Sequence, residues 1–508
     1  MEIQRKIPST MATQHPDNSC VPYWRLEDPN PNNKTAFITT QDEPDECYRT
    51  FSELEIDEHK WDWEGKFVDE AVFDRLFRVH EEYFRQNSIG KDKFLTYRLP
   101  NPKVEKYRVR RALTGISSAA EMAEEYGFHS PPVFEVILPM TESAEEIMNI
   151  STAYDKFMHL DHPLFRFENG IENRLEVIPL FEQVSTIGRS HKILEEYILM
   201  YQDYYKTKPI YIRPYIARSD PALNSGIVPT VAIEKVANSR YRRFEERFGI
   251  PLFPILGCAA LPFRGGLTPL NVEDFILEYP GINTVTLQGA YRYDYPKHQV
   301  IEGNRKLNKL LPKNQKPIID EEEEEIIESL LIFFEQPYKE TIEAIPEVIN
   351  NVAKFIPSRR ERVQHIGLFG YSRGGLPRAI PFTGSLYSLG IPPEMIGTGR
   401  GLQKVKEMGM LDYIEKFCKN LKQDLVRSGT FFNRENLNEL AKKSNAWDGV
   451  QSDVRAIEKY LQFEFIPLTS EDKEYHNLTT NIFKRLDLGG LPIGNLVEEA
   501  AKMRKSIG

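Results

Sequence analysis

Six short apolar segments recur between residues 93 and 292, spaced roughly 30 to 40 residues apart. They are KFLTYR at 93–98, VFEVILPMTE at 133–142, LEVIPLFEQ at 175–183, YIRPYIARSD at 211–220, PLFPILGCA at 251–259 and TVTLQGAYR at 284–292. They are rich in β-branched and aromatic residues and lack strict alternation, which is typical of strands buried on both faces. The stretches between them are long enough for helices. The pattern therefore predicts an α/β fold, a (β/α)8 TIM-type barrel elaborated by additional, largely C-terminal helices.

Two later segments complete the predicted count of eight strands. RVQHIGLFGYSR at 362–373 predicts a seventh strand, and RAIPFTGSLYSLGIPPEMIG at 378–397 predicts the last barrel element. From Leu402 onward amphipathic segments alternate with polar breaks, which indicates a layer of helices. We therefore predict a single unit, 1–508, with an N-terminal arm and helices at 1–92, the barrel at 93–400 and a C-terminal helical layer at 401–508.

The size and charge of the chain restrict what the protein can bind. Its 508 residues exceed the about 250 that such a barrel uses, so extra helices are expected. A net charge of −10 argues against a broad nucleic-acid-binding surface, which needs clustered basic residues. The four cysteines form no CxxC pair, and no apolar run has the length of a signal peptide or of a membrane span. We expect a cytoplasmic protein that binds neither nucleic acid nor membrane.

Charged side chains stand where the predicted strands end, at the functional face of such a barrel. They are Arg98, Glu142, Glu182, Asp220 and Arg292. Glu182 and Asp220 follow neighbouring strands, which lie ~4.8 Å apart in a parallel sheet, so both carboxylates can reach one Mg²⁺ or Mn²⁺ ion. The alternative is that they cap the helices that follow the strands.

Arginine is frequent at the same strand ends. The set is Arg98, Arg218, Arg264, Arg292 and Arg373. Guanidinium groups present paired donors that match phosphate and carboxylate oxygens, so the set predicts an anionic substrate. Gly265 and Gly266, directly after Arg264, would let backbone amides approach such an anion and could act as flexible points of a lid. The alternative interpretation of this glycine pair is an ordinary surface loop.

His15 is the histidine with the most suggestive local sequence, STMATQHPDN at 9–18. Pro16 and Asp17 would fix the local turn and orient the imidazole, which suits a general base. The alternative is an inert histidine in a loop.

Further motifs follow one another along the chain in the order known from one family. They are STMATQHPDN at 9–18, WDWEGK at 61–66, VIPLFEQ at 177–183, ARSDPALNSG at 217–226, PFRGG at 262–266, TLQGAYR at 286–292, LPRAIPF at 376–382 and AAKMRKSIG at 500–508. These segments resemble phosphoenolpyruvate carboxylase, and specifically its short archaeal type. The long bacterial and plant enzymes carry TAHP, VVPLFET, GYSDSAKDAG, HGRGG, TEQGEMIR and LRAIPW at the corresponding places.

The resemblance implies carboxylation of phosphoenolpyruvate with bicarbonate to give oxaloacetate and inorganic phosphate. The route would pass through carboxyphosphate and a metal-stabilised pyruvate enolate, and would serve anaplerotic carbon fixation. The resemblance also implies Mg²⁺ or Mn²⁺ as the cofactor and a homotetramer built as a dimer of dimers. The implied site comprises Glu182 and Asp220 as metal ligands, His15, Arg98 and Arg264 as catalytic residues, and Arg218, Gln288, Arg292 and Arg373 as substrate contacts.

The chain departs from the long enzymes at one basic position. Leu223 stands where the SDSAKD motif of those enzymes has its lysine, and Arg218 stands where they have a tyrosine. Arg218 is therefore our candidate for the displaced phosphate contact. Two other functions remain open at this point: a different metal-dependent barrel lyase that acts on an enolate, and a catalytically silent relative that binds phosphorylated metabolites.

Overall fold

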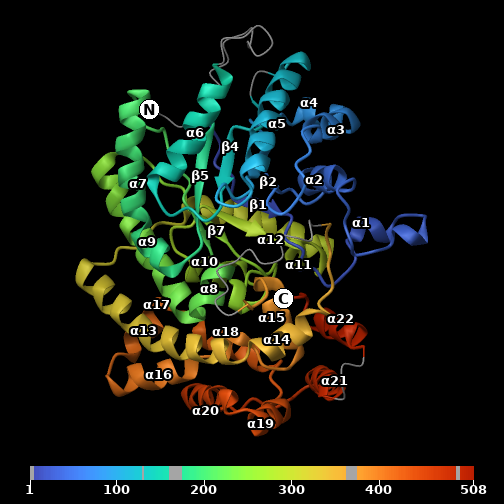
Figure 1. Ribbon diagram of the computed structural model, residues 1–508, viewed down its shortest axis with the longest axis vertical. Coiled ribbons are helices and arrows are strands. Elements are labelled where there is room, and N and C mark those ends of the chain that lie inside the picture. Colours follow the sequence, from blue (N-terminus) through green and yellow to red (C-terminus); the bar gives the residue numbers. More distant parts are fainter. Residues whose placement is uncertain (1–4, 129–130, 160–173, 362–374, 488–491) are drawn as a thin grey trace.

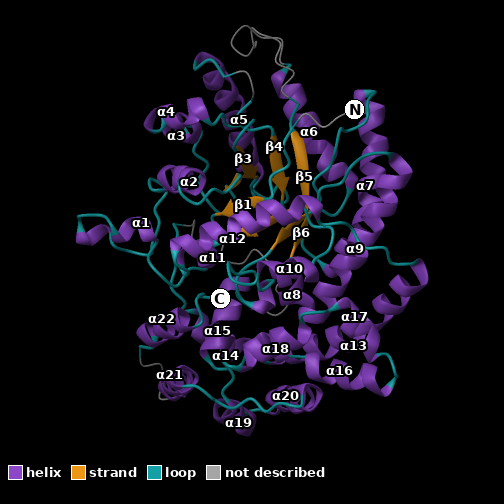
Figure 2. Ribbon diagram, turned by 180° about the vertical axis from the view of Figure 1, so that it is seen from behind, coloured by secondary structure: helices purple, strands orange, loops and turns teal. Residues whose placement is uncertain are grey.

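The computed structural model describes residues 5–128, 131–159, 174–361, 375–487 and 492–508. At its centre is a closed barrel of eight parallel strands in sequence order, with β8 paired to β1 (Figure 2). The strands are β1 Thr10–Thr13, β2 Glu58–Asp62, β3 Phe94–Arg98, β4 Glu135–Leu138, β5 Glu176–Phe181, β6 Tyr215–Ala217, β7 Ile255–Gly257 and β8 Thr284–Leu287. The predicted (β/α)8 TIM-type barrel is confirmed.

The barrel begins earlier in the chain than predicted. Each of the six apolar segments contains one strand, β3 to β8, but β1 and β2 lie within the first 92 residues. The placement of the barrel at 93–400 is therefore corrected to strands running from Thr10 to Leu287. The segment 378–397 was wrongly predicted as a barrel element, because Ala379–Ser388 forms helix α15. The strand predicted at 362–373 lies outside the described residues, and the treatment of the chain as a single unit stays a prediction.

Helices surround the barrel and form a layer at one end of it (Figure 1). Those up to residue 310 are α1 Tyr23–Leu26, α2 Glu43–Ser52, α3 Val72–Val79, α4 Glu81–Gln86, α5 Lys106–Glu125, α6 Ala144–Met158, α7 Val184–Tyr205, α8 Ser219–Ser225, α9 Ile227–Phe248, α10 Val272–Glu278, α11 Gly289–Tyr293 and α12 Lys297–Leu310. The later ones are α13 Glu321–Ala344, α14 Pro346–Ala353, α15 Ala379–Ser388, α16 Thr398–Glu407, α17 Leu411–Phe417, α18 Leu421–Gly429, α19 Arg434–Lys443, α20 Asp448–Leu461, α21 Ser470–Asp487 and α22 Gly494–Met503. The predicted C-terminal helical layer is thus present. In the described part of the chain, none of the helices combines the length and the apolar character that crossing a membrane demands.

The inside of the barrel is partly apolar and partly charged. Residues from several strands, among them Met11, Ile178 and Ile255, form a small apolar cluster. Beside it, the buried guanidinium of Arg213 donates to Glu135 Oε2 at 2.6 Å and to Glu58 Oε2 at 2.7 Å. This charged triad joins β2, β4 and the residues before β6 across the barrel interior. Removing one member of such a buried set typically costs about 3–5 kcal/mol, because a charge is left without a partner.

The C-terminal layer closes over the carboxyl ends of the strands. The amide of Ile507 donates to the carbonyl of Asp17, which follows β1, at 2.7 Å. Helix α15 packs against both α8 and α22. The chain end and the barrel mouth are therefore in direct contact.

Candidate active site

A cavity of about 660 Å³ lies at the carboxyl ends of the barrel strands. Its barrel side is formed by residues at or just after β1, β2, β3, β5, β6, β7 and β8. Its other side is formed by residues 353–361 and 377–381, which precede or begin the C-terminal layer. The cavity is therefore located where barrels of this type carry their functional groups.

The cavity brings together most of the residues that the sequence predicted. Those that line it are His15, Arg98, Glu182, Arg218, Asp220, Arg264 and Gln288. Arg292 and Glu142 do not line it. Arg373 lies outside the described residues.

Glu182 and Asp220 stand at neighbouring strand ends, one directly after β5 and one in the first turn of α8. Glu182 Oε2 accepts a hydrogen bond of 2.7 Å from the amide of Met140, whose positive φ of 53° turns the backbone after β4 toward it. Loss of hydration in the cavity, with the nearby charge of Asp220, raises the pKa of Glu182 to about 8. Loss of hydration also raises the pKa of Asp220. Neither carboxylate belongs to the N-cap residue of the helix that follows it, since those residues are Gln183 and Arg218.

This carboxylate pair fits a divalent cation. Two carboxylates held together without a cation between them resist ionisation, and a bound cation would lower both pKa values. Among the described residues, no third acidic, histidine or cysteine side chain completes a metal-binding group. Two protein carboxylates with remaining positions for water and substrate oxygens are the usual arrangement for Mg²⁺.

Arg98 is held rigidly at the edge of the cavity. Its Nε and Nη2 donate to the two oxygens of Asp62 at 2.8 and 2.7 Å, and Nη2 also pairs with Glu64 at 2.7 Å. Register explains the first contact, because Asp62 and Arg98 are neighbours on β2 and β3. Such a fork of two bonds fixes the plane of the guanidinium.

Arg264 is fixed by contacts from four parts of the chain. Its Nε donates to Ser219 Oγ at 3.0 Å and its Nη2 to Gln288 Oε1 at 2.7 Å. Its Nη1 contacts Asp17 Oδ2 at 3.4 Å and donates to the carbonyl of Gly508. Gln288 therefore orients Arg264 at the cavity wall.

Arg218 and Arg292 make hydrogen bonds to groups that do not line the cavity. Arg218 lines the cavity, and its Nε donates to the hydroxyl of Tyr279, which directly follows α10, at 3.0 Å. Arg292 Nη2 donates to the carbonyl of Thr13 at 2.6 Å and pairs with Glu46 at 3.1 Å. These contacts give Arg292 a role in holding α2 against β1, and its predicted contact with substrate gains no support from the cavity.

His15 lies in the cavity between the ends of β1 and β2. Its Nδ1 is 2.9 Å from Thr13 Oγ1. Burial, and after it the positive charges of Lys60 and Arg98, hold the pKa of His15 well below its usual range. At neutral pH the imidazole is therefore uncharged and able to accept a proton.

Comparison with known proteins decides the family. A family model described as phosphoenolpyruvate carboxylase matches residues 7–508. The chain belongs to the phosphoenolpyruvate carboxylase family. The predicted family is thereby confirmed, and with it the prediction that the chain is an enzyme.

Several curated relatives carry the name phosphoenolpyruvate carboxylase. The chain is 36% identical over 512 residues to the one from Oenococcus oeni, with both chains covered completely. It is 37% identical to the one from Metallosphaera sedula, covering 99% of this chain and all of the relative. It is 38% identical to the one from Pyrococcus furiosus, over 84% of this chain and 89% of the relative. Archaeal proteins are thus among these relatives.

The cavity of this phosphoenolpyruvate carboxylase family member also contains residues that the sequence analysis missed. Lys60, Arg360 and Arg378 line it. Lys60 belongs to EHKWDWE at 58–64, where charged and aromatic or imidazole residues alternate with a period of two. This alternation is the pattern of a strand with a polar face, and it could have located β2 and Lys60.

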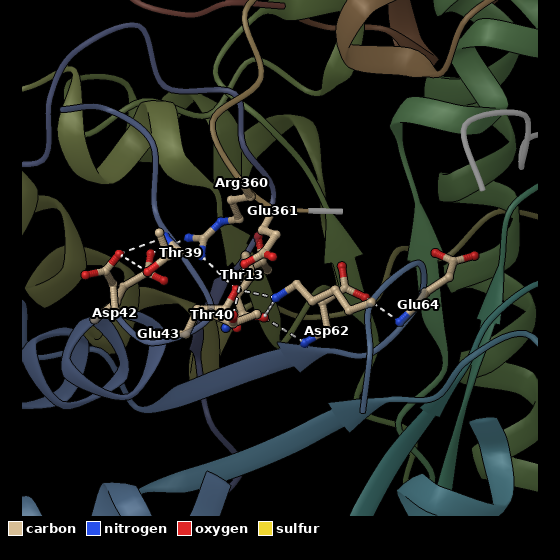
Figure 3. A network of polar contacts seen from close by, with 12 residues as sticks. Thr13, Thr39, Thr40, Asp42, Glu43, Asp62, Glu64, Arg360 and Glu361 are labelled. Atoms are coloured by element: carbon tan, nitrogen blue, oxygen red, sulfur yellow. Dashed lines mark hydrogen bonds and ion pairs between the residues drawn. The ribbon is translucent and has the colours of Figure 1, made fainter. Parts of the chain in front are cut away.

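Arg360 anchors the outer wall of the cavity to the barrel. Its guanidinium pairs with Glu43 at 3.3 Å and with Glu46, both on α2. Figure 3 shows Arg360 and Glu361 beside Thr40 and Glu43, and Thr40 Oγ1 donates to Glu361 Oε2 at 3.0 Å. The wall at 357–361 is thereby fixed to the segment that connects β1 with β2.

The backbone at Gly265, next to Arg264, lies too close to Cys258 for any side chain. Its φ of 117° is one that other residues rarely adopt, and a Cβ on it would lie 2.6 Å from Cys258 Cβ. Gly266 also has a positive φ, 77°, but a Cβ there would approach nothing closer than 3.4 Å. Gly265→Ala should therefore lower the free energy of unfolding by about 3 kcal/mol, from backbone strain and overpacking together. Gly266→Ala should cost only the backbone part, about 1–2 kcal/mol.

Urea unfolding of the two glycine variants and the unsubstituted protein checks this difference. Equal loss of stability in the two variants would show that the contact with Cys258 is not what requires glycine at 265.

Proposed function

We propose that this protein carboxylates phosphoenolpyruvate with bicarbonate, giving oxaloacetate and inorganic phosphate. The observation that carries the proposal is the meeting of an uncharged histidine, a carboxylate pair and two fixed arginines in one cavity of a phosphoenolpyruvate carboxylase family member. The names of the relatives agree with it. A product of this kind would serve anaplerotic carbon fixation.

The proposed reaction has two steps. A bicarbonate oxygen attacks phosphorus, and the bond from phosphorus to the enol oxygen breaks, giving carboxyphosphate and the enolate of pyruvate. Carboxyphosphate then loses its carboxyl proton and splits into carbon dioxide and phosphate, and the enolate carbon bonds to carbon dioxide. The proton leaves with phosphate, so that phosphoenolpyruvate and bicarbonate become oxaloacetate and hydrogen phosphate with atoms and charge balanced.

The side chains of the cavity have complementary roles in this reaction. Arg98 and Arg264 face the transferring phosphoryl group, where preorganised positive charge lowers the barrier. His15 takes the carboxyl proton of carboxyphosphate. The contact of Nδ1 with Thr13 leaves Nε2 as the accepting atom when Nδ1 carries the hydrogen. Arg218 and Gln288 are proposed as parts of the cavity wall, and Arg292 and Arg373 remain predicted substrate contacts.

Glu182 and Asp220 would hold the divalent cation, Mg²⁺ or Mn²⁺. Bound there, the cation would supply positive charge for the oxygen of the pyruvate enolate. The cavity must also exclude water, because a protonated enolate would be lost as pyruvate. Residues 353–361 and 377–381 cover the strand ends in this way. For the assembled protein, we propose a homotetramer of two dimers in the cytoplasm.

The proposal is tested by following oxaloacetate and phosphate together. Purified protein is given phosphoenolpyruvate, and bicarbonate and Mg²⁺ are each omitted in turn. Equal amounts of both products, formed only when both additions are present, are the expected result. Phosphate or pyruvate that forms without bicarbonate would indicate a different enzyme acting on an enolate, and binding of phosphoenolpyruvate without any product would indicate a silent binder.

A further inference from the structure

Strand β2 carries three ionisable side chains toward the barrel interior, and only two of them have partners. Glu58, near the start of the strand, bonds to Arg213, and Asp62, at its end, bonds to Arg98. Lys60 lies between them and is completely buried. Its Nζ has no hydrogen-bond partner in the described part of the chain. The nearest aromatic contact is the ring of Tyr215, with its centroid 5.7 Å from Nζ.

A buried ammonium group without a partner is unfavourable, and proteins almost always pair such a group. Burial, with the nearby charge of Arg98, lowers the pKa of Lys60 to about 7. The side chain also lines the cavity, next to His15 and Arg98. A cation that is unpaired, buried and adjacent to a ligand cavity indicates that an anion completes its contacts.

The position of Lys60 selects among the anions of the reaction. Its Cα lies two residues before that of Asp62 on β2, about 6.6 Å back along the strand, so Lys60 starts from a deeper level of the barrel than the Asp62–Arg98 pair. A small anion reaches this depth more readily than phosphoenolpyruvate does. Lysine is also a single point charge, whereas the arginines at the mouth offer the paired donors that suit a phosphoryl group.

We propose that Lys60 binds bicarbonate in the carboxylation proposed above, and so is a further substrate-binding residue of that reaction. The inference rests on that proposed function. Lys60 holds one bicarbonate oxygen at the floor of the cavity, beside His15. The same contact then keeps the carboxyl group of carboxyphosphate within reach of the imidazole that takes its proton.

The test compares Lys60→Met with Lys66→Met. Both remove a buried lysine, but Lys66 is paired with Glu43 and bonds to Gln14 Oε1 at 2.7 Å, and it does not line the cavity. We expect Lys60→Met to raise the KM for bicarbonate at least tenfold and to change the KM for phosphoenolpyruvate less than threefold. Its melting temperature should equal or exceed that of the unsubstituted protein, because an unpaired buried charge is removed. Lys66→Met should melt earlier and leave the KM for bicarbonate unchanged.

Three results would overturn the assignment. An unchanged KM for bicarbonate would exclude the contact, and a rise in the KM for phosphoenolpyruvate alone would assign Lys60 to the other substrate. A lower melting temperature with both constants unchanged would make the lysine structural. Oxaloacetate formation by the unsubstituted protein is measured first. If the unsubstituted protein forms no oxaloacetate, the proposed function fails and the assignment of Lys60 fails with it. If it does form oxaloacetate, the three results above test Lys60 alone.

Discussion

Replacing His15 with asparagine should separate phosphate release from oxaloacetate formation. Asparagine keeps a polar side chain in the cavity but cannot accept the proton of carboxyphosphate. General-base catalysis typically contributes about 10²–10⁴-fold, so oxaloacetate formation should fall by that order. The first step does not need the imidazole, and phosphate release should fall less than about tenfold because the carboxyphosphate left behind can hydrolyse in water. The measurement is the ratio of phosphate to oxaloacetate in a single reaction, expected to rise well above one.

The acid limb of the pH profile provides a second check on His15. Its folded-state pKa lies well below the value of about 6.5 expected in the unfolded chain. The base form therefore persists as the pH falls through 6.5, and activity should not decline there through His15. For the same reason, stability contributed by the neutral imidazole is present above pH 6.5 and is lost as the pH falls toward the folded pKa.

A matched substitution controls for general effects of the exchange. His298 is exposed on α12 and does not line the cavity, so His298→Asn should leave both products equal. If His15→Asn also forms the two products at the normal ratio, His15 is not the base.

Replacing Asp220 with asparagine should raise the requirement for Mg²⁺ sharply. The amide has nearly the same size as the carboxylate but lacks its charge, so one of two charged ligands is lost. We expect the Mg²⁺ concentration for half-maximal activity to rise by about 10²-fold, the upper end of the 10–100-fold loss usual for groups that only support a ligand. Titration of activity with Mg²⁺ at saturating phosphoenolpyruvate and bicarbonate measures the effect.

Glu142 offers the control for Asp220. It also follows a barrel strand, but it pairs with Lys103 at 2.7 Å and does not line the cavity. Glu142→Gln should therefore leave the Mg²⁺ requirement unchanged. Unchanged activation of Asp220→Asn by Mg²⁺ would remove Asp220 from the proposed ligands.

Apolar patterning was sufficient to predict the barrel and six of its strands, because β3 to β8 are buried on both faces and lie in apolar segments. It failed for β1 and β2 for different physical reasons. Thr10–Thr13 has threonine at both ends and so forms no apolar run, and Glu58–Asp62 is charged on its interior face. The segment 378–397 was mistaken for a barrel element because α15 is almost entirely buried. In sequence, a buried helix segment cannot be told from a buried strand by its periodicity alone.

The site was predicted from the residues at strand ends, and the predicted side chains that follow their strands closely do line the cavity. Glu182, Asp220 and Arg98 reach the cavity in this way. Glu142 does not, because the backbone turns at Met140 and sends it toward Lys103. Arg292 does not line the cavity, because Glu46, far away in sequence, pairs with it, and no local pattern reveals that contact.

The charged triad inside the barrel has a consequence for how the protein is made. Arg213 follows Glu58 by 155 residues, and at about 5–20 residues per second a ribosome needs roughly 10–30 s to add them. Until then Glu58 must stay hydrated, so β2 cannot settle into a closed interior. Pairing of Thr10 with Val285 waits longer still. The nascent chain should therefore emerge as an open, unfinished sheet and close after most of the barrel has left the ribosome, a period in which chaperones would have access to its exposed strands.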